Sequence, residues 1–229
     1  MSAMAKAQKR TIRERLFAPG CALWLYKPEL AERLGRFLAG EPGGADLSLT
    51  CCKNQPVLET GTEVVNVCPG CDKRYRNNYP DASTVSMWEV LAGSETFPFP
   101  DYDGLEMSIN DACPTRERTG VHDAVRTLLA RMNIRVVEPE RTRTHGICCG
   151  DSLWGEIPTD EMKRLMAKRA SEMPAEDVVV YCVSCAKAMF IGGKKPRYLV
   201  DLLFGEDTVP GTLDPDAWHK ELDDFIRDH

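Results

Sequence analysis

Residues 177–185 read DVVVYCVSC, and residues 63–71 read EVVNVCPGC. In both stretches a short run of β-branched residues leads into a Cys-x-x-Cys motif, and such runs predict buried strands. Two weaker examples are RLFAPGC at 15–21 and MSINDAC at 107–113, where a single cysteine follows a short apolar run. We therefore predict four strands, each with a cysteine at or just beyond its carboxyl end.

The ten cysteines repeat one order of spacing. Each half of the chain holds a single cysteine, then an adjacent pair, then Cys-x-x-Cys, and no cysteine is left over. The first set is Cys21, Cys51, Cys52, Cys68 and Cys71, and the second set is Cys113, Cys148, Cys149, Cys182 and Cys185. From the pair to the Cys-x-x-Cys motif there are 15 residues in the first set and 32 in the second. The shared order indicates an internal duplication, with a helix missing from the first copy.

Helices are predicted between the strands. Apolar residues recur at three- and four-residue spacing over 28–39, 121–132 and 159–172. Alternating strands and helices predict an α/β fold with mostly parallel sheets, in which ligands bind beyond the carboxyl ends of strands. The expected architecture is two duplicated Rossmann-like halves related by pseudo-two-fold symmetry, residues 1–100 and 101–229, with the cysteine sites at those strand ends. Residues 92–104 read as the linker, and the tail of residues 196–229, helical at 198–204, is expected to pack on the core without chemistry of its own.

The overall composition excludes several classes of protein. The 229 residues carry a net charge of −6, which gives no basic footprint for nucleic acid. No apolar run approaches the roughly 18 residues of a membrane span, and the first segment lacks the apolar core of a signal peptide. We therefore expect a cytoplasmic protein whose thiols are kept reduced. A basic cluster near the start is read as a solvated arm or a dock for an acidic partner; it comprises Lys6, Lys9, Arg10, Arg13 and Arg15.

Reduced cysteines at this density point to metal binding or redox work. Thiolates are the soft ligands that iron–sulfur clusters and zinc select. Each set offers five donors where a cubane cluster or a zinc ion needs four, so either one cysteine is not a ligand or the cluster is not a simple cubane. Adjacent cysteines also fit the ligand spacing of structural zinc sites poorly.

The order Cys, Cys-Cys-Gly, Cys-x-x-Cys resembles the cysteine-rich CCG domain, which occurs twice in the catalytic subunit of heterodisulfide reductases. The resemblance runs from about residue 15 to residue 190 and is best in the second half, with Cys148-Cys149-Gly150; in the first half Lys53 replaces the glycine. It implies a duplicated α/β fold and non-cubane [4Fe-4S] clusters, each held by the five cysteines of one motif. For the shortened first half, zinc is the alternative.

The function expected from this resemblance is an iron–sulfur oxidoreductase that reduces a disulfide or a related small sulfur substrate. Its electron donor is expected to be a flavoprotein or a ferredoxin-like protein, because the chain has neither GxGxxG nor a ferredoxin CxxCxxC run. Three alternatives stay open. They are an electron-transfer subunit without a substrate, a metal-free thiol–disulfide protein built on the Cys-x-x-Cys motifs, and a zinc-only structural module.

Some charged residues close to the cysteines in sequence are also candidates. Cations there would raise the reduction potential of an anionic cluster or hold an anionic substrate, unless they are simple surface charges. They are Lys53, Lys73, Arg74, Arg116 and Arg118. His145, three residues before Cys148, could donate a proton to a leaving thiolate. The four tryptophans show no stacking pattern and are expected in the core or at a rim.

Overall fold

The computed structural model describes residues 14–228, so Lys6, Lys9, Arg10 and Arg13 of the basic cluster lie outside the described residues. The strands are β1 (Glu14–Ala18), β2 (Asp46–Leu47), β3 (Thr62–Asn66), β4 (Ser83–Ser86), β5 (Glu106–Asn110), β6 (Arg135–Val137), β7 (Asp177–Val180) and β8 (Lys195–Tyr198). The α-helices are α1 (Cys21–Tyr26), α2 (Pro28–Gly40), α3 (Pro69–Asn78), α4 (Met87–Ala92), α5 (Thr119–Arg131), α6 (Thr159–Ser171), α7 (Val183–Ile191), α8 (Leu199–Phe204) and α9 (Pro215–Asp228). Short 3-10 helices are η1 (Cys113–Thr115), η2 (Arg143–His145) and η3 (Asp151–Leu153).

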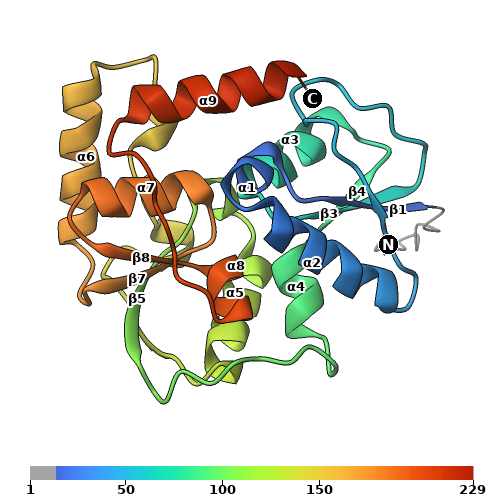
Figure 1. Cartoon of the computed structure of the whole chain (residues 1–229), viewed down its shortest axis with the longest axis horizontal. Helices are drawn as coiled ribbons and strands as arrows, with labels where there is room; N and C mark the ends of the chain where they lie inside the picture. Colours follow the sequence, from blue (N-terminus) through green and yellow to red (C-terminus); the bar gives the residue numbers. More distant parts are fainter. Residues whose placement is uncertain (1–13, 229) are drawn as a thin grey trace, which may run out of the picture.

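The strands form two four-stranded sheets, ordered β2-β1-β3-β4 and β6-β5-β7-β8, and every pair is parallel. Counted within its own half, each sheet has the same strand order. The prediction of an α/β fold with parallel sheets is therefore confirmed, and one sheet lies in each half of the chain (Figure 1).

The four predicted strands are β1, β3, β5 and β7. Val64 and Val65 of β3 and Val178 and Val179 of β7 are at most 1% exposed, as expected for central strands of a sheet covered on both faces. Each of the two strands then leads into a helix that begins with the Cys-x-x-Cys motif. Cys68 is the N-cap of α3, and Cys182 is the N-cap of α7.

The three helices predicted from periodicity are present as α2, α5 and α6, within two residues of the expected ends. The shortening of the first half has the predicted cause. Between β2 and β3 the described chain contains no helix, whereas α6 fills the corresponding stretch of the second half. The loop of residues 48–61 therefore brings Cys51 and Cys52 to the sheet directly.

One continuous apolar core joins the two halves. It contains residues from both sheets, and α4 of the first half packs on α5 of the second. The segment between α4 and β5 has neither helix nor strand, but it is part of this core. Its Phe97 is 6% exposed, and the Phe97 ring lies 5.2 Å from the Phe37 ring and 5.7 Å from the Phe204 ring.

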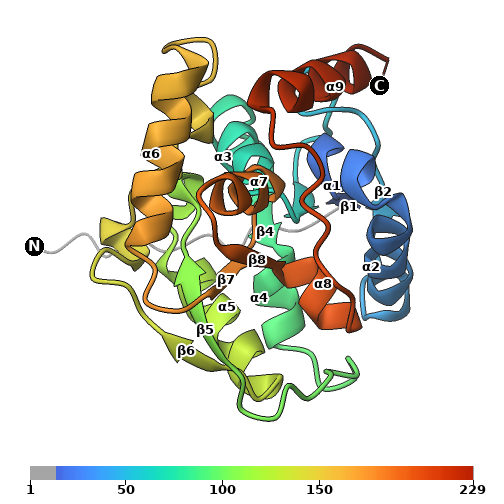
Figure 2. The same cartoon turned by 60° about the vertical axis from the view of Figure 1, so that its left-hand side comes forward.

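Helix α9 lies across one end of the molecule, over both halves (Figures 1 and 2). It packs on α1, and its apolar side chains recur at helical spacing along one face, at Trp218, Leu222, Phe225 and Ile226. Trp218 is buried and its Nε1 donates to Ser184 Oγ at 3.4 Å, while Asn54 Nδ2 donates to the Ile226 carbonyl at 2.7 Å. The helix is thus attached to α7 at one end and to the loop after Cys52 at the other. None of the helices described between residues 14 and 228 is long and apolar enough to cross a membrane.

Candidate functional site: two five-cysteine clusters

The first five cysteines meet at the carboxyl end of the first sheet. Cys21 begins α1 after β1, and the Cys21 thiol hydrogen-bonds to Cys51. Cys51 hydrogen-bonds in turn to its neighbour Cys52, and Cys52 Sγ lies 3.3 Å from Cys71 Sγ. Cys71 also hydrogen-bonds to Cys68. The sulfur atoms therefore form one chain of contacts that runs through all five residues.

The second five cysteines are arranged in the same order. Cys113 hydrogen-bonds to Cys148, and Cys148 to Cys149. Cys149 Sγ lies 3.5 Å from Cys185 Sγ, and Cys185 hydrogen-bonds to Cys182. In both halves the adjacent pair links the single cysteine on one side to the second cysteine of the Cys-x-x-Cys motif on the other. The structure therefore brings all ten predicted site residues into two clusters, and all ten thiols are free.

The charge distribution inside the clusters is also alike. Hydrogen bonds from the thiols of Cys21 and Cys52 lower the pKa of Cys51 to about 3. Hydrogen bonds from Cys113 and Cys149 likewise place the pKa of Cys148 far below its ordinary value. The pKa of the first cysteine of each pair is therefore lowered furthest in its cluster, because this cysteine accepts from a thiol on either side.

Each cluster lines a cavity. The first cavity has a volume of about 180 Å³, and all five cysteines of the first set lie in its wall. The second, of about 200 Å³, is lined by the five cysteines of the second set. The two cavities have four wall residues in common, namely Ala22, Cys68, Gly70 and Leu222. The two sites are therefore neighbours, and a cysteine of the first set borders both.

Backbone groups approach the sulfur atoms closely. The Lys53 amide donates to Cys51 Sγ at 3.5 Å, and the Gly150 amide donates to Cys148 Sγ at 3.3 Å. Gly20 has a φ of +88°, and an added Cβ would lie 2.7 Å from Cys68 Cβ. A glycine is needed at this position both for the backbone conformation and for the approach of the Cys21 loop to Cys68.

Helix α9 forms a roof over both cavities. Leu222 lines both of them, and Ile226 lines the first. At the second site His219 Nε2 lies 3.2 Å from Asp151 Oδ1, and the His219 ring stacks on Trp154 at 4.3 Å between centroids. Leu222, Ile226 and His219 were missed by sequence reasoning, which expected no chemistry in the tail. The amphipathic spacing along α9 is the signal that would have found Leu222 and Ile226.

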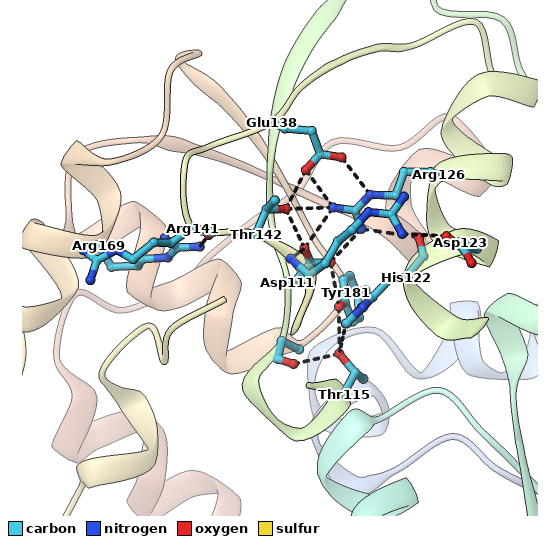
Figure 3. A network of polar contacts seen from close by, with 12 residues as sticks. Asp111, Thr115, His122, Asp123, Arg126, Glu138, Arg141, Thr142, Arg169 and Tyr181 are labelled. Atoms are coloured by element: carbon cyan, nitrogen blue, oxygen red, sulfur yellow. Dashed lines mark hydrogen bonds and ion pairs between the residues drawn. The ribbon is translucent and has the colours of Figure 1, made fainter. Parts of the chain in front are cut away.

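A buried polar network fixes the loops of the second site (Figure 3). Asp111, two residues before Cys113, accepts two hydrogen bonds from Arg126, at 2.7 and 2.9 Å. The same carboxylate accepts from the Tyr181 hydroxyl at 3.0 Å and from Thr142 Oγ1 at 3.0 Å. Tyr181 precedes Cys182, and residue 142 begins the loop to the cysteine pair, so one carboxylate joins all three cysteine-bearing segments.

The first half has no counterpart of this network among the described residues. At the positions that correspond to Asp111 and Tyr181, two before Cys21 and one before Cys68, the chain has Pro19 and Val67. An ion pair from the second half secures the first site instead. Arg118 Nη1 donates to both carboxylate oxygens of Asp72, at 3.0 and 3.1 Å, directly after Cys71.

The five cationic residues predicted near the sites differ in their positions and contacts. Arg118 is engaged with Asp72 and with Glu89, and Arg116 donates to the Gly146 carbonyl at 3.0 and 3.2 Å. Lys53 and Arg74 line the first cavity, whereas Lys73 does not. His145 is exposed and its ring hydrogen-bonds to the Thr144 hydroxyl. Trp88 and Trp218 are core residues, as expected.

The donors fit an iron–sulfur cluster in their chemistry. Each cavity presents five soft thiol ligands with backbone N–H groups directed at their sulfur atoms. Hard carboxylate ligands are scarce, and only Asp151 lines the second cavity. No three His, Cys, Asp or Glu side chains in the part of the chain that is described form a preformed site for a single metal ion. Comparison with models of protein families and with curated proteins found no match for this chain.

Proposed function

We propose that this chain is an iron–sulfur oxidoreductase with one cluster in each half. The observation that carries the proposal is the identical order of sulfur contacts in the two sets of cysteines. Five thiols from segments far apart in sequence converge in both halves, although the loops between them differ in length. Binding of the same cofactor in both halves would explain why the same arrangement of five cysteines occurs twice. Cysteines that bind nothing would not need this arrangement.

The cofactor we propose is the non-cubane [4Fe-4S] cluster implied by the resemblance to CCG domains, and with it a duplication of two Rossmann-like halves about a pseudo-two-fold axis. The equal strand orders of the two sheets support the duplication. The first set would hold one cluster and the second set the other, and zinc in the shortened first half is the alternative occupant. When bound, such clusters supply one-electron transfer.

Residues of the chain would ligate these clusters, donate hydrogen bonds to their sulfur ligands and cover them with apolar side chains. Cysteine thiolates ligate, and the amides of Lys53 and Gly150 donate to the sulfur atoms of Cys51 and Cys148. Such hydrogen bonds stabilise negative charge and raise the reduction potential. Leu222 would give both clusters an apolar wall, because it lines each cavity.

The reaction we propose is reductive cleavage of a disulfide in a small sulfur substrate. One disulfide takes up two electrons and two protons, the S–S bond breaks, and two thiols leave. The electrons would come singly from a flavoprotein or ferredoxin-like donor in the cytoplasm. Two neighbouring one-electron sites suit a two-electron bond, and the shared wall of the cavities supports their acting together.

Iron and acid-labile sulfide in anaerobically purified protein test this proposal. We expect a brown protein with iron and sulfide in equal amounts, and reoxidation of the dithionite-reduced protein by an added disulfide. A colourless protein without iron would contradict the proposal. A protein that contains iron but is not reoxidised by disulfides would instead be an electron-transfer subunit.

A metal-free thiol–disulfide protein is the second candidate, and one observation favours it. Cys68 is the N-cap of α3, and a hydrogen bond from Cys71 lowers the Cys68 pKa to about 7, as in helix-terminal redox motifs. This function uses two cysteines of each set and leaves the adjacent pairs without a role. Full disulfide-exchange activity in iron-free protein, retained in Cys52→Ser, would favour it.

A further inference from the structure

A second, open cavity adjoins the first cysteine site. It has a volume of about 410 Å³ and shares Cys52, Lys53 and Arg74 with the first cavity, so the two form one path from solvent to the cysteines. Its other wall residues are Gln55, Pro56, Asn78 and Tyr79. We call this outer cavity the mouth of the first site.

The lining of the mouth is cationic and rich in hydrogen-bond donors. Lys53 and Arg74 supply two positive charges, and no carboxylate is among the wall residues. Arg74 is exposed and forms no salt bridge in the described part of the chain. Lys53 lies 3.7 Å from Asp223 of α9, and both side chains are about half exposed, so this pair is weak and leaves the ammonium available.

The lining of the second site is not cationic. Its cavity is lined by no lysine or arginine, and the carboxylate of Asp151 lies in its wall. Against a net charge of −6 for the whole chain, the mouth is therefore a local positive site beside a thiol. Such a site concentrates small anions and orients them.

We propose that the mouth binds the acid group of an anionic substrate, a carboxylate, sulfonate or phosphate, and thereby places the substrate's sulfur beside Cys52. The guanidinium of Arg74 suits planar or tetrahedral oxyanions because it presents paired N–H donors. The statement that the anion is a substrate rests on the proposed function, whereas the anion site itself requires only the residues of the mouth.

Calorimetric titration of the full chain under anaerobic conditions and at low salt tests the inference. The probes are thiodiglycolate, a thioether with two carboxylates, and bis(2-hydroxyethyl) sulfide, its neutral analogue; neither undergoes exchange with the free thiols of the chain. We expect the dianion to bind more tightly than the neutral probe. Arg74→Gln should lower the affinity for the dianion about tenfold, which corresponds to the loss of one charge-assisted hydrogen bond. Lys53→Gln should also lower the affinity for the dianion. Added salt should lower the affinity for the dianion but leave that for the neutral probe unchanged.

Lys73→Gln is the matched control, since it removes one positive charge next to Arg74 from a side chain that does not line the mouth. Its affinity for the dianion should stay within about twofold of the parent chain. Equal binding of both probes, no binding, or an equal loss in Lys73→Gln and Arg74→Gln would overturn the anion site. Iron is measured in the same samples. If an iron-free chain binds the dianion selectively, the proposed function is wrong and the anion site stands. If the chain contains iron but does not bind the dianion selectively, the anion site is wrong and the proposed function stands.

Discussion

Asp111 joins the three segments that carry the second set of cysteines. Its carboxylate is 1% exposed and accepts from Arg126, Tyr181 and Thr142. Asp111→Asn removes the buried carboxylate from Arg126, which keeps its ion pair with the partly exposed Glu138, so we expect the free energy of unfolding in urea to fall by about 2 kcal/mol. Asp123→Asn makes the same change in an exposed ion pair and should leave the stability nearly unchanged. Equal effects of the two substitutions would contradict this role of Asp111.

The same carboxylate predicts a pH dependence. Burial opposes its ionisation, but the bonds from Arg126 prevail and lower the Asp111 pKa from 3.8 to about 2. A carboxyl with a depressed pKa stabilises the fold above pH 4, and this contribution, about 2 kcal/mol, is lost as the pH falls through 2. The stability difference between the parent chain and Asp111→Asn should therefore shrink between pH 4 and pH 2. A difference that stays constant over this range would contradict the assignment.

Substitutions at Gly20 and Gly43 distinguish the effect of backbone strain from the effect of steric crowding at the first site. Both have a φ of +88°, but a Cβ on Gly20 meets Cys68 at 2.7 Å while a Cβ on Gly43 meets nothing within 4 Å. Gly43→Ala should lower the free energy of unfolding by about 1 kcal/mol through backbone strain alone. Gly20→Ala should cost more and displace Cys21 from Cys68, with loss of iron from the first half only. Similar stabilities and iron contents in the two variants would refute this.

At the scale of elements, α9 covers part of both cavities with apolar side chains. Leu222→Ser removes apolar cover shared by the two sites, so iodoacetamide should label the cysteines of both sets several-fold faster, as measured by mass spectrometry of iron-free protein. Leu213→Ser is the control, because Leu213 is 57% exposed and lines neither cavity. Faster labelling in the control, or in neither variant, would show that α9 is not a cover.

The elements show what the sequence could and could not predict. Strands β3 and β7 and helices α2, α5 and α6 follow from local periodicity, which is written in consecutive residues. Strand β2 has two residues and leaves no such pattern. The membership of the two cysteine sets was predictable from spacing. The contact order was not, because the packing of loops decides that Cys52 touches Cys71 and that Cys51 touches Cys21.

For helix α9, the sequence could predict the helix but not its position over the two cysteine sites. Its residues Trp218, Leu222, Phe225 and Ile226 follow helical spacing and could have been read as an amphipathic helix. That the apolar face covers cysteines of both halves depends on where the chain crosses after α8, which no local pattern encodes. The cationic mouth likewise depends on the loop after Cys52 lying beside α3.

At the scale of the molecule, one apolar core spans both halves, and Arg118 of the second half binds Asp72 of the first. The halves should therefore unfold together. We expect a single calorimetric transition with equal van't Hoff and calorimetric enthalpies in iron-free protein. Two resolved transitions would show that the duplicated halves are independent folding units.

The most direct test of the central claim is the iron content of half-site variants. The intact chain purified without oxygen should hold two four-iron clusters, about eight iron atoms. Cys52→Ser and Cys149→Ser alter corresponding members of the two sets, and each should retain about half of the iron with an equal amount of sulfide. An intact chain without iron, or variants that both keep the full amount, would contradict the account of two separate five-cysteine cluster sites.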